Sequence, residues 1–313
     1  MLQRHMSLIL TLGLSLALIG CASNPGRDDV APEYSELYNG EMQVAHEAGQ
    51  HEITSEEAIA NGDRALSEGN TDRAMYEYVH ALELSGGDSG VLNKIGGIHI
   101  RLGNLALAAR AYSLSLKLDA ENPAALEGAG LLFLRERRYE DAKRHLTVAL
   151  ERDPLLWQSL NGLGMMADLD GDHVKAAAYY RQALIIPPEA EQQPDNAVLL
   201  NNLGYSLYLS GDWQHALQYF HKALNYNPDL DRAWQNLGLV YTREGEYDRA
   251  LDAFRRVMDK PEAYNNIGFV CMINQDYDQA AYFFKKAIKL SPTYYVKAHE
   301  NLDRVNRLRG QDG

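Results

Sequence analysis

The sequence predicts an all-α solenoid of seven helix-turn-helix repeats that ends in a capping helix. A glycine recurs at intervals of 34, 34, 34, 40, 34 and 30 residues. An alanine follows each glycine by twelve residues, and a large apolar residue follows each alanine by four. A fixed period of this length is typical of a repeat array, in which each unit buries its apolar face against its neighbours.

The recurring residues have a common packing logic. The glycines are Gly62, Gly96, Gly130, Gly164, Gly204, Gly238 and Gly268. The alanines are Ala74, Ala108, Ala142, Ala176, Ala216, Ala250 and Ala280. The large residues are Tyr78, Tyr112, Leu146, Tyr180, Phe220, Phe254 and Phe284. Because glycine and alanine lack bulk, the two helices of a unit can pack closely there, and we expect the large residue to fill the groove against the neighbouring unit.

The chain divides into repeats at residues 55–190 and 197–294, with an insertion at 191–196 and a capping helix and tail at 295–313. The insertion lengthens one interval to 40 residues, and the last interval is shortened to 30. We therefore expect the array to bend or loosen at both joints and the first joint to divide it into two sub-arrays. Four units close with a proline, which cannot continue a helix, at Pro154, Pro188, Pro228 and Pro292.

This pattern resembles the tetratricopeptide repeat, a helix-turn-helix unit of 34 residues. Trp234 and Leu237 before Gly238 match the start of that repeat best, as do Leu200 and Leu203. The resemblance implies a protein-binding scaffold. It also implies that the first helix of each unit lines an inner groove, which in such proteins often holds an extended peptide.

The first 20 residues have the layout of a secretory signal peptide. A positive residue, Arg4, precedes an apolar run from Ser7 to Ile19. That run is shorter than the roughly 20 residues of a membrane-spanning helix, although a short transmembrane anchor is the alternative. Residues 21–54 contain little sustained apolar periodicity, and we interpret them mainly as a tether.

The end of this signal, Leu18-Ile19-Gly20-Cys21, resembles the bacterial lipobox. The resemblance implies lipidation of Cys21 and cleavage directly before it. Ala22 follows, where lipoproteins retained in the inner membrane commonly have aspartate. The resemblance therefore implies an outer-membrane lipid anchor with the protein facing the periplasm.

A candidate binding surface lies in the last three repeats. Paired amides precede their glycines at Asn201-Asn202, Gln235-Asn236 and Asn265-Asn266. Because a side-chain amide offers both a donor and an acceptor, a ladder of amides could hold a peptide backbone. The neighbouring groove candidates are Tyr205, Tyr208, Arg232, Leu239, Arg243, Phe269 and Met272. In the alternative, the amides serve local hydrogen bonding and the next helix covers the apolar residues.

Other chemistry has little support in the sequence. The net charge is −13 and no Lys/Arg run stands out, which argues against nucleic acid as a partner. The histidine pairs His46/His51 and His215/His221 lack the i, i+4 spacing of a helical metal site. Cys271 falls on the apolar side of its helix and is expected to be a packing residue. We expect no cofactor, no metal and no enzymatic activity.

The lipobox combined with the repeats resembles the tight-adherence (Flp) pilus assembly lipoproteins of the TadD family. The phrases 200–205, LNNLGY, and 264–269, YNNIGF, carry the resemblance. It implies a role in assembling or localising pilus components, including a secretin. The alternative is an adaptor lipoprotein that recruits peptidoglycan hydrolases or synthases. The protein partner and self-association through the end repeats stay open.

Overall fold

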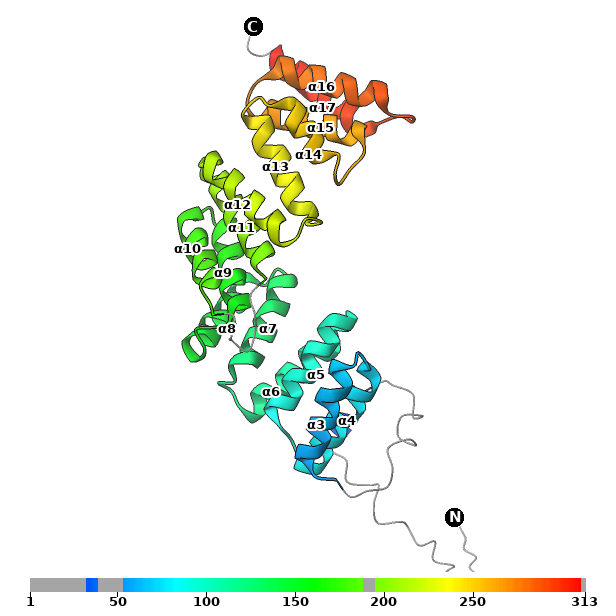
Figure 1. The fold of residues 1–313 in the computed structure, drawn as a ribbon, viewed down its shortest axis with the longest axis vertical. Coiled ribbons are helices and arrows are strands. Elements are labelled where there is room, and N and C mark those ends of the chain that lie inside the picture. Colours follow the sequence, from blue (N-terminus) through cyan, green and yellow to red (C-terminus); the bar gives the residue numbers. More distant parts are fainter. Residues whose placement is uncertain (1–31, 39–52, 188–194, 311–313) are drawn as a thin grey trace, which may run out of the picture.

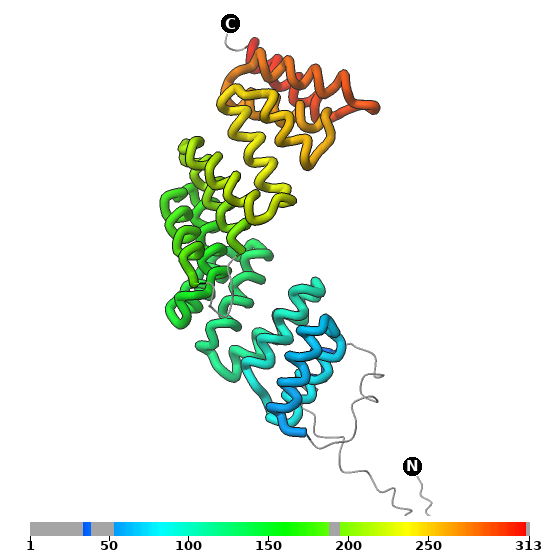
Figure 2. The backbone as a smooth tube through the Cα atoms, viewed as in Figure 1, coloured from blue at the N-terminus to red at the C-terminus, as the bar shows by residue number. Residues whose placement is uncertain are grey.

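The computed structural model describes residues 32–38, 53–187 and 195–310, and these form a curved, elongated stack of helix pairs (Figures 1 and 2). The first helices of the pairs are α3 (Ser55–Ser67), α5 (Ser89–Leu102), α7 (Pro123–Arg135), α9 (Trp157–Leu169), α11 (Asn196–Leu209), α13 (Asp231–Arg243) and α15 (Lys260–Ile273). The second helices are α4 (Thr71–Ser85), α6 (Leu105–Leu118), α8 (Tyr139–Arg152), α10 (His173–Leu184), α12 (Trp213–Tyr226), α14 (Tyr247–Phe254) and α16 (Tyr277–Leu290). The predicted all-α solenoid is confirmed.

Each register glycine faces the large residue of its own unit. A Cβ atom built on any of the seven would lie 2.6–2.8 Å from that side chain, closer than van der Waals contact allows. The large residue also reaches the next unit in two places, where Tyr112 packs against Gly128 and Leu146 against Gly162. The expected close approach of the two helices is therefore confirmed, and Tyr112 and Leu146 are shared between their own unit and the next.

The first helices form the inner layer of the array. From α5 onwards each first helix contacts the first helix of the next unit, whereas successive second helices make no comparable contact within the described residues. A layer whose members lie closer together forms the concave side of a curved stack. The opening of the curve lies between α5 and α13 in Figure 1, and α10 lies on its outer edge.

The turn inside each unit contains one residue with left-handed backbone. It is a glycine in five units, with φ between 76° and 88°, and Arg137 or Gln275, with φ of 60° and 65°, in the other two. Glycine takes this conformation without the steric cost that a Cβ atom imposes. The turn geometry is thus kept in units that lack the glycine.

The hydrophobic core is unevenly divided along the array. One cluster runs continuously from Leu160 in α9 to Val305 at the C-terminal end, and it includes Ile186 and Leu199 on the two sides of the expected insertion. The insertion therefore does not split the array into two sub-arrays, although its residues 191–194 lie outside the described residues. The subdivision lies at the third repeat instead, where α7 and α8 contribute to three small clusters.

The four residues missing before the last repeat shorten α14. This helix has 8 residues and ends at Phe254, whereas α12 and α16 have 14 each. Because a turn of the second helix is absent, α15 begins at Lys260, shortly after it. The sequence predicts a joint here, and the structure shows that the missing residues are accommodated by a shorter second helix, α14.

Part of the predicted tether packs on the repeats. Residues 32–38 contain the short helix α1 (Pro32–Ser35), and Tyr34 and Leu37 belong to the core formed by α3, α4, α5 and α6. Leu37 is fully buried. Residues 21–54 are interpreted from the sequence mainly as a tether, and residues 34 and 37 depart from that interpretation because their side chains pack on the repeats. The signal peptide and Cys21 lie outside the described residues.

A last helix, α17 (Val296–Arg309), covers the final repeat and buries Ala298 and Val305. This confirms the predicted capping helix. Within residues 32–38, 53–187 and 195–310, no helix is long and apolar enough to cross a membrane.

Candidate functional site

The inner face of the last four repeats presents a regular row of exposed apolar side chains. The residue directly after the register glycine is Met165, Tyr205 or Phe269 in three of these units, and these side chains are 40%, 38% and 40% exposed. In the fourth unit the same position is Leu239, which is half-buried. Large apolar side chains repeated on one exposed face indicate a surface that contacts another molecule.

A second row lies one helical turn further along the same helices. It consists of the exposed Leu169, Leu209 and Ile273, together with Arg243 in the sixth unit. The i, i+4 spacing places both rows on one helix face. The sequence reasoning identified Tyr205, Leu239 and Phe269 but missed Met165, Leu169, Leu209 and Ile273. Their fixed spacing from the glycines would have identified them.

The paired amides join neighbouring units to one another. The Asn202 Nδ2 donates to Asn161 Oδ1 at 2.8 Å, and the Asn236 Nδ2 donates to Asn201 Oδ1 at 2.9 Å. The Asn201 Nδ2 lies 3.3 Å from Asn202 Oδ1 and links the two bonds. A relay of side-chain amides therefore runs across α9, α11 and α13. In the pair Asn201-Asn202, one member donates to the preceding unit and the other accepts from the following unit.

The same arrangement recurs at the end of the array with a substitute partner. Asn265 is fully buried, and its Oδ1 accepts a hydrogen bond of 3.0 Å from Asn301 in α17. The Asn266 Nδ2 contacts the Met258 sulfur at 3.2 Å. Asn201 and Asn265 are both interior, so their burial keeps them from presenting amides to a ligand. For these two residues the structure matches the local hydrogen-bonding alternative, because each side-chain oxygen accepts a hydrogen bond from a neighbouring helix, whereas the buried Nδ2 of Asn265 has no partner among the described residues.

The remaining predicted groove residues have different degrees of exposure. Arg232 and Gln235 are exposed, Asn202, Tyr208, Asn236, Leu239, Arg243 and Asn266 are half-buried, and Met272 is buried. Met272 packs in the large core and does not line the surface, because it lies on the side of α15 that faces the core.

Arg243 forms an aromatic corner with the preceding unit. Its guanidinium carbon lies 5.9 Å from the ring centre of Tyr208 and 5.4 Å from that of Trp213. These are cation–π distances, and they fix a positive charge beside the apolar rows. The Tyr205 and Tyr208 rings stack with their centres 6.2 Å apart.

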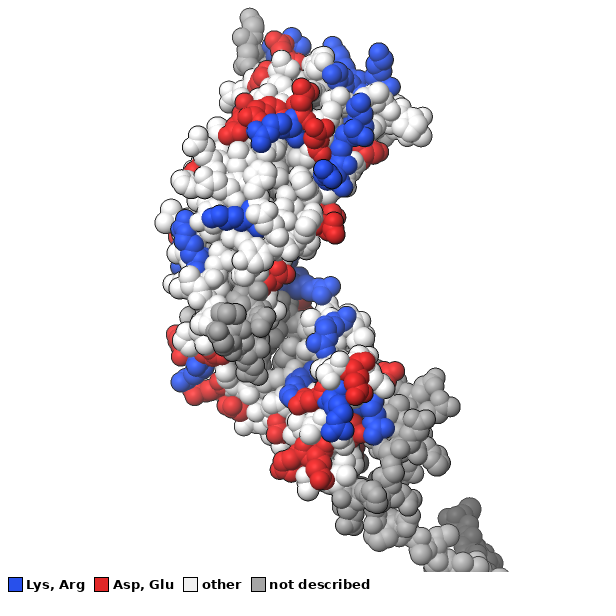
Figure 3. All heavy atoms as spheres, viewed as in Figure 1, with Lys and Arg blue, Asp and Glu red and all other residues white. Residues whose placement is uncertain are grey.

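The first three repeats present a different inner face. The position after the glycine is Asp63, Gly97 or Leu131, and Asp63 forms an ion pair with Lys94. The position four residues further along is Ser67, Arg101 or Arg135, all exposed. Charged side chains gather toward the two ends of the array on the face shown in Figure 3, and the region between them carries few.

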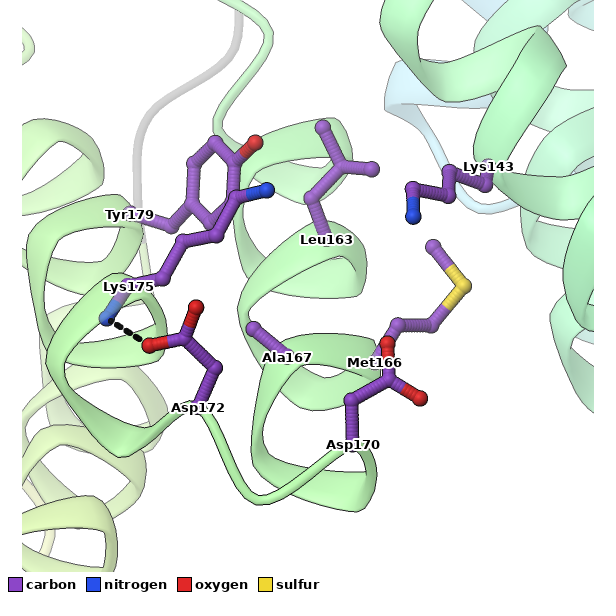
Figure 4. A pocket seen from close by; sticks show the side chains of 8 residues that line it. All are labelled: Lys143, Leu163, Met166, Ala167, Asp170, Asp172, Lys175 and Tyr179. Carbon is purple, nitrogen blue, oxygen red and sulfur yellow. Dashed lines mark hydrogen bonds between the residues drawn. The ribbon is translucent and has the colours of Figure 1, made fainter.

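The pocket between α8, α9 and α10 is small, and the described residues contain no cluster of potential metal ligands. No group of three His, Cys, Asp or Glu side chains within them can hold a metal ion. A pocket between α8, α9 and α10 has a volume of about 110 Å³, and its polar rim includes Lys143 and Asp170 (Figure 4). This is smaller than the roughly 300–1,000 Å³ of typical ligand sites. The bond drawn there, from the Lys175 backbone N–H to Asp172, caps the start of α10.

Cys271 is a buried free thiol in α15. Burial raises the pKa of this thiol to about 11, so the reactive thiolate form is scarce at neutral pH. Its placement agrees with the predicted packing role.

Comparisons with known proteins identify the repeat. Residues 93–142, 127–197, 195–260 and 261–294 match the tetratricopeptide repeat. Among curated proteins, the cell division cycle protein 16 homolog of Homo sapiens is 28% identical over 140 residues. The match covers 42% of this chain and spans only 23% of that relative.

Solved structures share the architecture at low sequence identity. PilW, a widely conserved type IV pilus biogenesis factor, is 17% identical with a TM-score of 0.55, over 68% of this chain and 98% of that chain. PilF of Pseudomonas aeruginosa is 19% identical with a TM-score of 0.52, over 68% of this chain and 95% of that chain. At this level of identity the likeness concerns the fold.

Proposed function

The chain belongs to the tetratricopeptide repeat family, whose members are protein-interaction scaffolds, and on this premise we propose that it binds a protein partner through the inner face of its last four repeats. The observation that carries the proposal is the double row of exposed apolar side chains on α9, α11 and α15, which α13 continues with the half-buried Leu239 and Arg243. Such a surface favours a partner segment that inserts its own apolar side chains between the rows.

Polar side chains along the rows can form hydrogen bonds with the backbone of a bound peptide. Asn202 and Asn236 each use one N–H in the relay between units, and a side-chain amide has two. The exposed Gln235 adds another amide beside them. Arg243, held between two rings, favours a partner with an acidic group nearby. The binding segment is thus expected to combine apolar side chains with at least one carboxylate.

The sequence supports a cellular setting for this scaffold. The lipobox-like residues 18–21 and the signal-like residues 1–20 favour a lipid anchor on Cys21 at the outer membrane, with the repeats facing the periplasm. The fold resemblance to PilW, together with the likeness of the sequence to pilus assembly lipoproteins, favours a partner from pilus or secretin assembly. The protein would act by holding that component and would carry out no reaction itself.

The test of binding is a pull-down of the full chain from its native cells, with the captured proteins identified by mass spectrometry. We expect a secretin or pilus-assembly component to be recovered. The double variant Tyr205→Ser with Phe269→Ser is expected to lose it while keeping the helical fold, since both side chains are about 40% exposed. Recovery of peptidoglycan hydrolases or synthases instead would replace the pilus role with the adaptor role.

The anchor is tested separately. Cells fed radiolabelled palmitate are expected to label the wild-type protein and not the Cys21→Ser variant. An unlabelled wild-type protein that remains in the soluble fraction would contradict the lipid anchor and leave the binding surface unaffected.

A further inference from the structure

The chain fills one slot on its outer surface with its own N-terminal segment. Leu37 is fully buried and Tyr34 is 7% exposed, and both join the core of α4, α5 and α6. The Tyr34 hydroxyl donates to the Gly86 carbonyl at 3.3 Å, and the His99 Nε2 lies 2.9 Å from the Leu37 carbonyl oxygen. Glu36 pairs with Arg110 on α6. An aromatic side chain, a leucine and a carboxylate thus hold this segment in the slot.

A corresponding slot near the other end of the array is open. It is a cavity of about 500 Å³ formed by α14, α15 and α16. Its lining residues Leu251, Tyr264 and Phe283 occupy the same positions relative to their register glycines as Met75, Leu92 and Ala111. Those three counterparts belong to the core cluster that receives Tyr34 and Leu37. The open slot is therefore the structural equivalent of the filled one.

The open slot has aromatic walls and a charged rim, in which Lys286 and Arg249 are cationic and Glu246 and Asp248 are acidic. The Phe283 ring centre lies 4.9 Å from that of Tyr247 and 6.0 Å from that of Tyr264. The Lys286 Nζ lies 5.2 Å from the ring centre of Tyr264 and 4.5 Å from that of Tyr282. Tyr282 occupies the position of Arg110, and Lys286 follows it by one helical turn. A positive charge is thus available one turn from where Arg110 meets Glu36 in the filled slot.

We propose that the slot between α14 and α16 docks a helical turn of a partner protein that carries an aromatic and an aliphatic side chain three residues apart, with an acidic residue between them. This is the chemistry of Tyr34-Ser35-Glu36-Leu37 in the equivalent slot. The rings of Tyr247, Tyr264 and Phe283 receive the apolar side chains, and Lys286 pairs with the carboxylate. The slot lies on the outer layer, so this second contact is independent of the inner-face binding surface.

The test uses a fluorescent peptide with the sequence of residues 31–40, APEYSELYNG, added to the full chain, whose own segment already fills the first slot. We expect the peptide to bind and its affinity to fall by about tenfold in Lys286→Glu, because the ion pair becomes a repulsion. The matched control is Lys285→Glu, an exposed neighbour outside the cavity, which is expected to bind like the wild type.

A charge swap completes the test. A peptide with Glu36→Lys is expected to bind Lys286→Glu better than it binds the wild-type chain. Absence of peptide binding to the wild type, or an equal loss in both lysine variants, would overturn the proposal. Self-association of the full chain that disappears in Lys286→Glu would place a second copy in the slot and also overturn it. The inner-face variant Tyr205→Ser with Phe269→Ser should keep peptide binding, so the two proposals fail separately.

Discussion

In the first three repeats the residue after the register glycine is Asp63, Gly97 or Leu131, whereas in the last four it is Met165, Tyr205, Leu239 or Phe269. Both regions use the same helix pairs and the same glycine contacts. The two regions differ in the side chains on their inner face. They also differ in their cores, because one hydrophobic cluster spans the last four repeats whereas the third repeat contributes to three small clusters. The positions that build the repeat are therefore separable from the inner-face positions, which differ between the two regions while the glycine contacts stay the same.

The cores of the two regions predict different responses to truncation. Phe220 lies in the continuous core of the last four repeats and is fully buried, whereas Tyr112 lies in a small cluster. Phe220→Ala is expected to cost about 3–5 kcal/mol of unfolding free energy. It should lower hydrogen-exchange protection from α9 to α17, while Tyr112→Ala should affect only α5, α6 and α7. If both variants lowered hydrogen-exchange protection over the same helices, the division of the core into clusters would not determine which helices unfold together.

Alanine substitutions at two adjacent glycines distinguish the effect of side-chain packing from the effect of helix propensity. A Cβ atom on Gly96 would lie 2.7 Å from the Tyr112 ring, whereas one on Gly97 would meet nothing within 4 Å. Gly96→Ala is expected to destabilise the chain by about 1–3 kcal/mol through overpacking. Gly97→Ala should stabilise it by up to about 1 kcal/mol, because alanine favours helix. Urea unfolding of both variants checks this, and a change of the same sign in both would contradict it.

The amide relay predicts a coupled effect in the second region. Asn236→Ala leaves the Oδ1 of the buried Asn201 without its 2.9 Å hydrogen bond, which is expected to cost about 1–2 kcal/mol. A double-mutant cycle with Asn201→Ala should then show non-additive losses, because the two side chains share that bond. Gln235→Ala, at an exposed position, is the control and should change stability by no more than about 0.5 kcal/mol.

The ion pair on the first region should have the smallest effect. Burial tends to raise the pKa of Asp63, but hydrogen bonds from Lys94 and Tyr78 outweigh it and hold that pKa below its ordinary value of 3.8. A carboxylate with a lowered pKa stabilises the fold above its unfolded-state pKa, and this contribution is lost as the pH falls through the folded-state value. Asp63→Asn is therefore expected to cost about 0.2–1 kcal/mol at pH 7.

The same measurement should show the loss shrinking below pH 3.8, where the wild-type carboxylate itself becomes protonated. Thermal unfolding of both proteins at pH 7 and at low pH checks the difference. A cost that persists unchanged at low pH would mean that the charge of Asp63 is irrelevant to stability.

The architecture could be predicted from the sequence because the same residue spacing recurs in seven units. One glycine or one tyrosine is ambiguous, but the spacing from Gly62 to Tyr78 recurs in every unit up to Gly268 and Phe284. The capping helix followed from the same logic. The division of the core at the third repeat could not be predicted in this way, because it depends on side-chain contacts between units that spacing alone does not define.

The binding surface was harder to predict from the residues. The pairs Asn201-Asn202 and Asn265-Asn266 have the same appearance whether they bind a ligand or join two units, and only their hydrogen-bond partners separate the two roles. The docking of Tyr34 and Leu37 was missed because two apolar residues within a polar stretch carry no periodicity. Met165 and Ile273 were missed although their register was already available in the sequence.

The central claim, that the partner contacts the inner face of the last four repeats, is tested most directly by photocrosslinking in native cells. A photoreactive phenylalanine analogue would replace Phe269 or Tyr205 on the inner face, Gly97 in the first region, or Ile185, which is 79% exposed outside the two inner rows. We predict crosslinks to one protein partner from Phe269 and Tyr205 and none from Gly97 or Ile185. Crosslinks to that partner from Ile185 or Gly97, with none from Phe269 or Tyr205, would contradict the account.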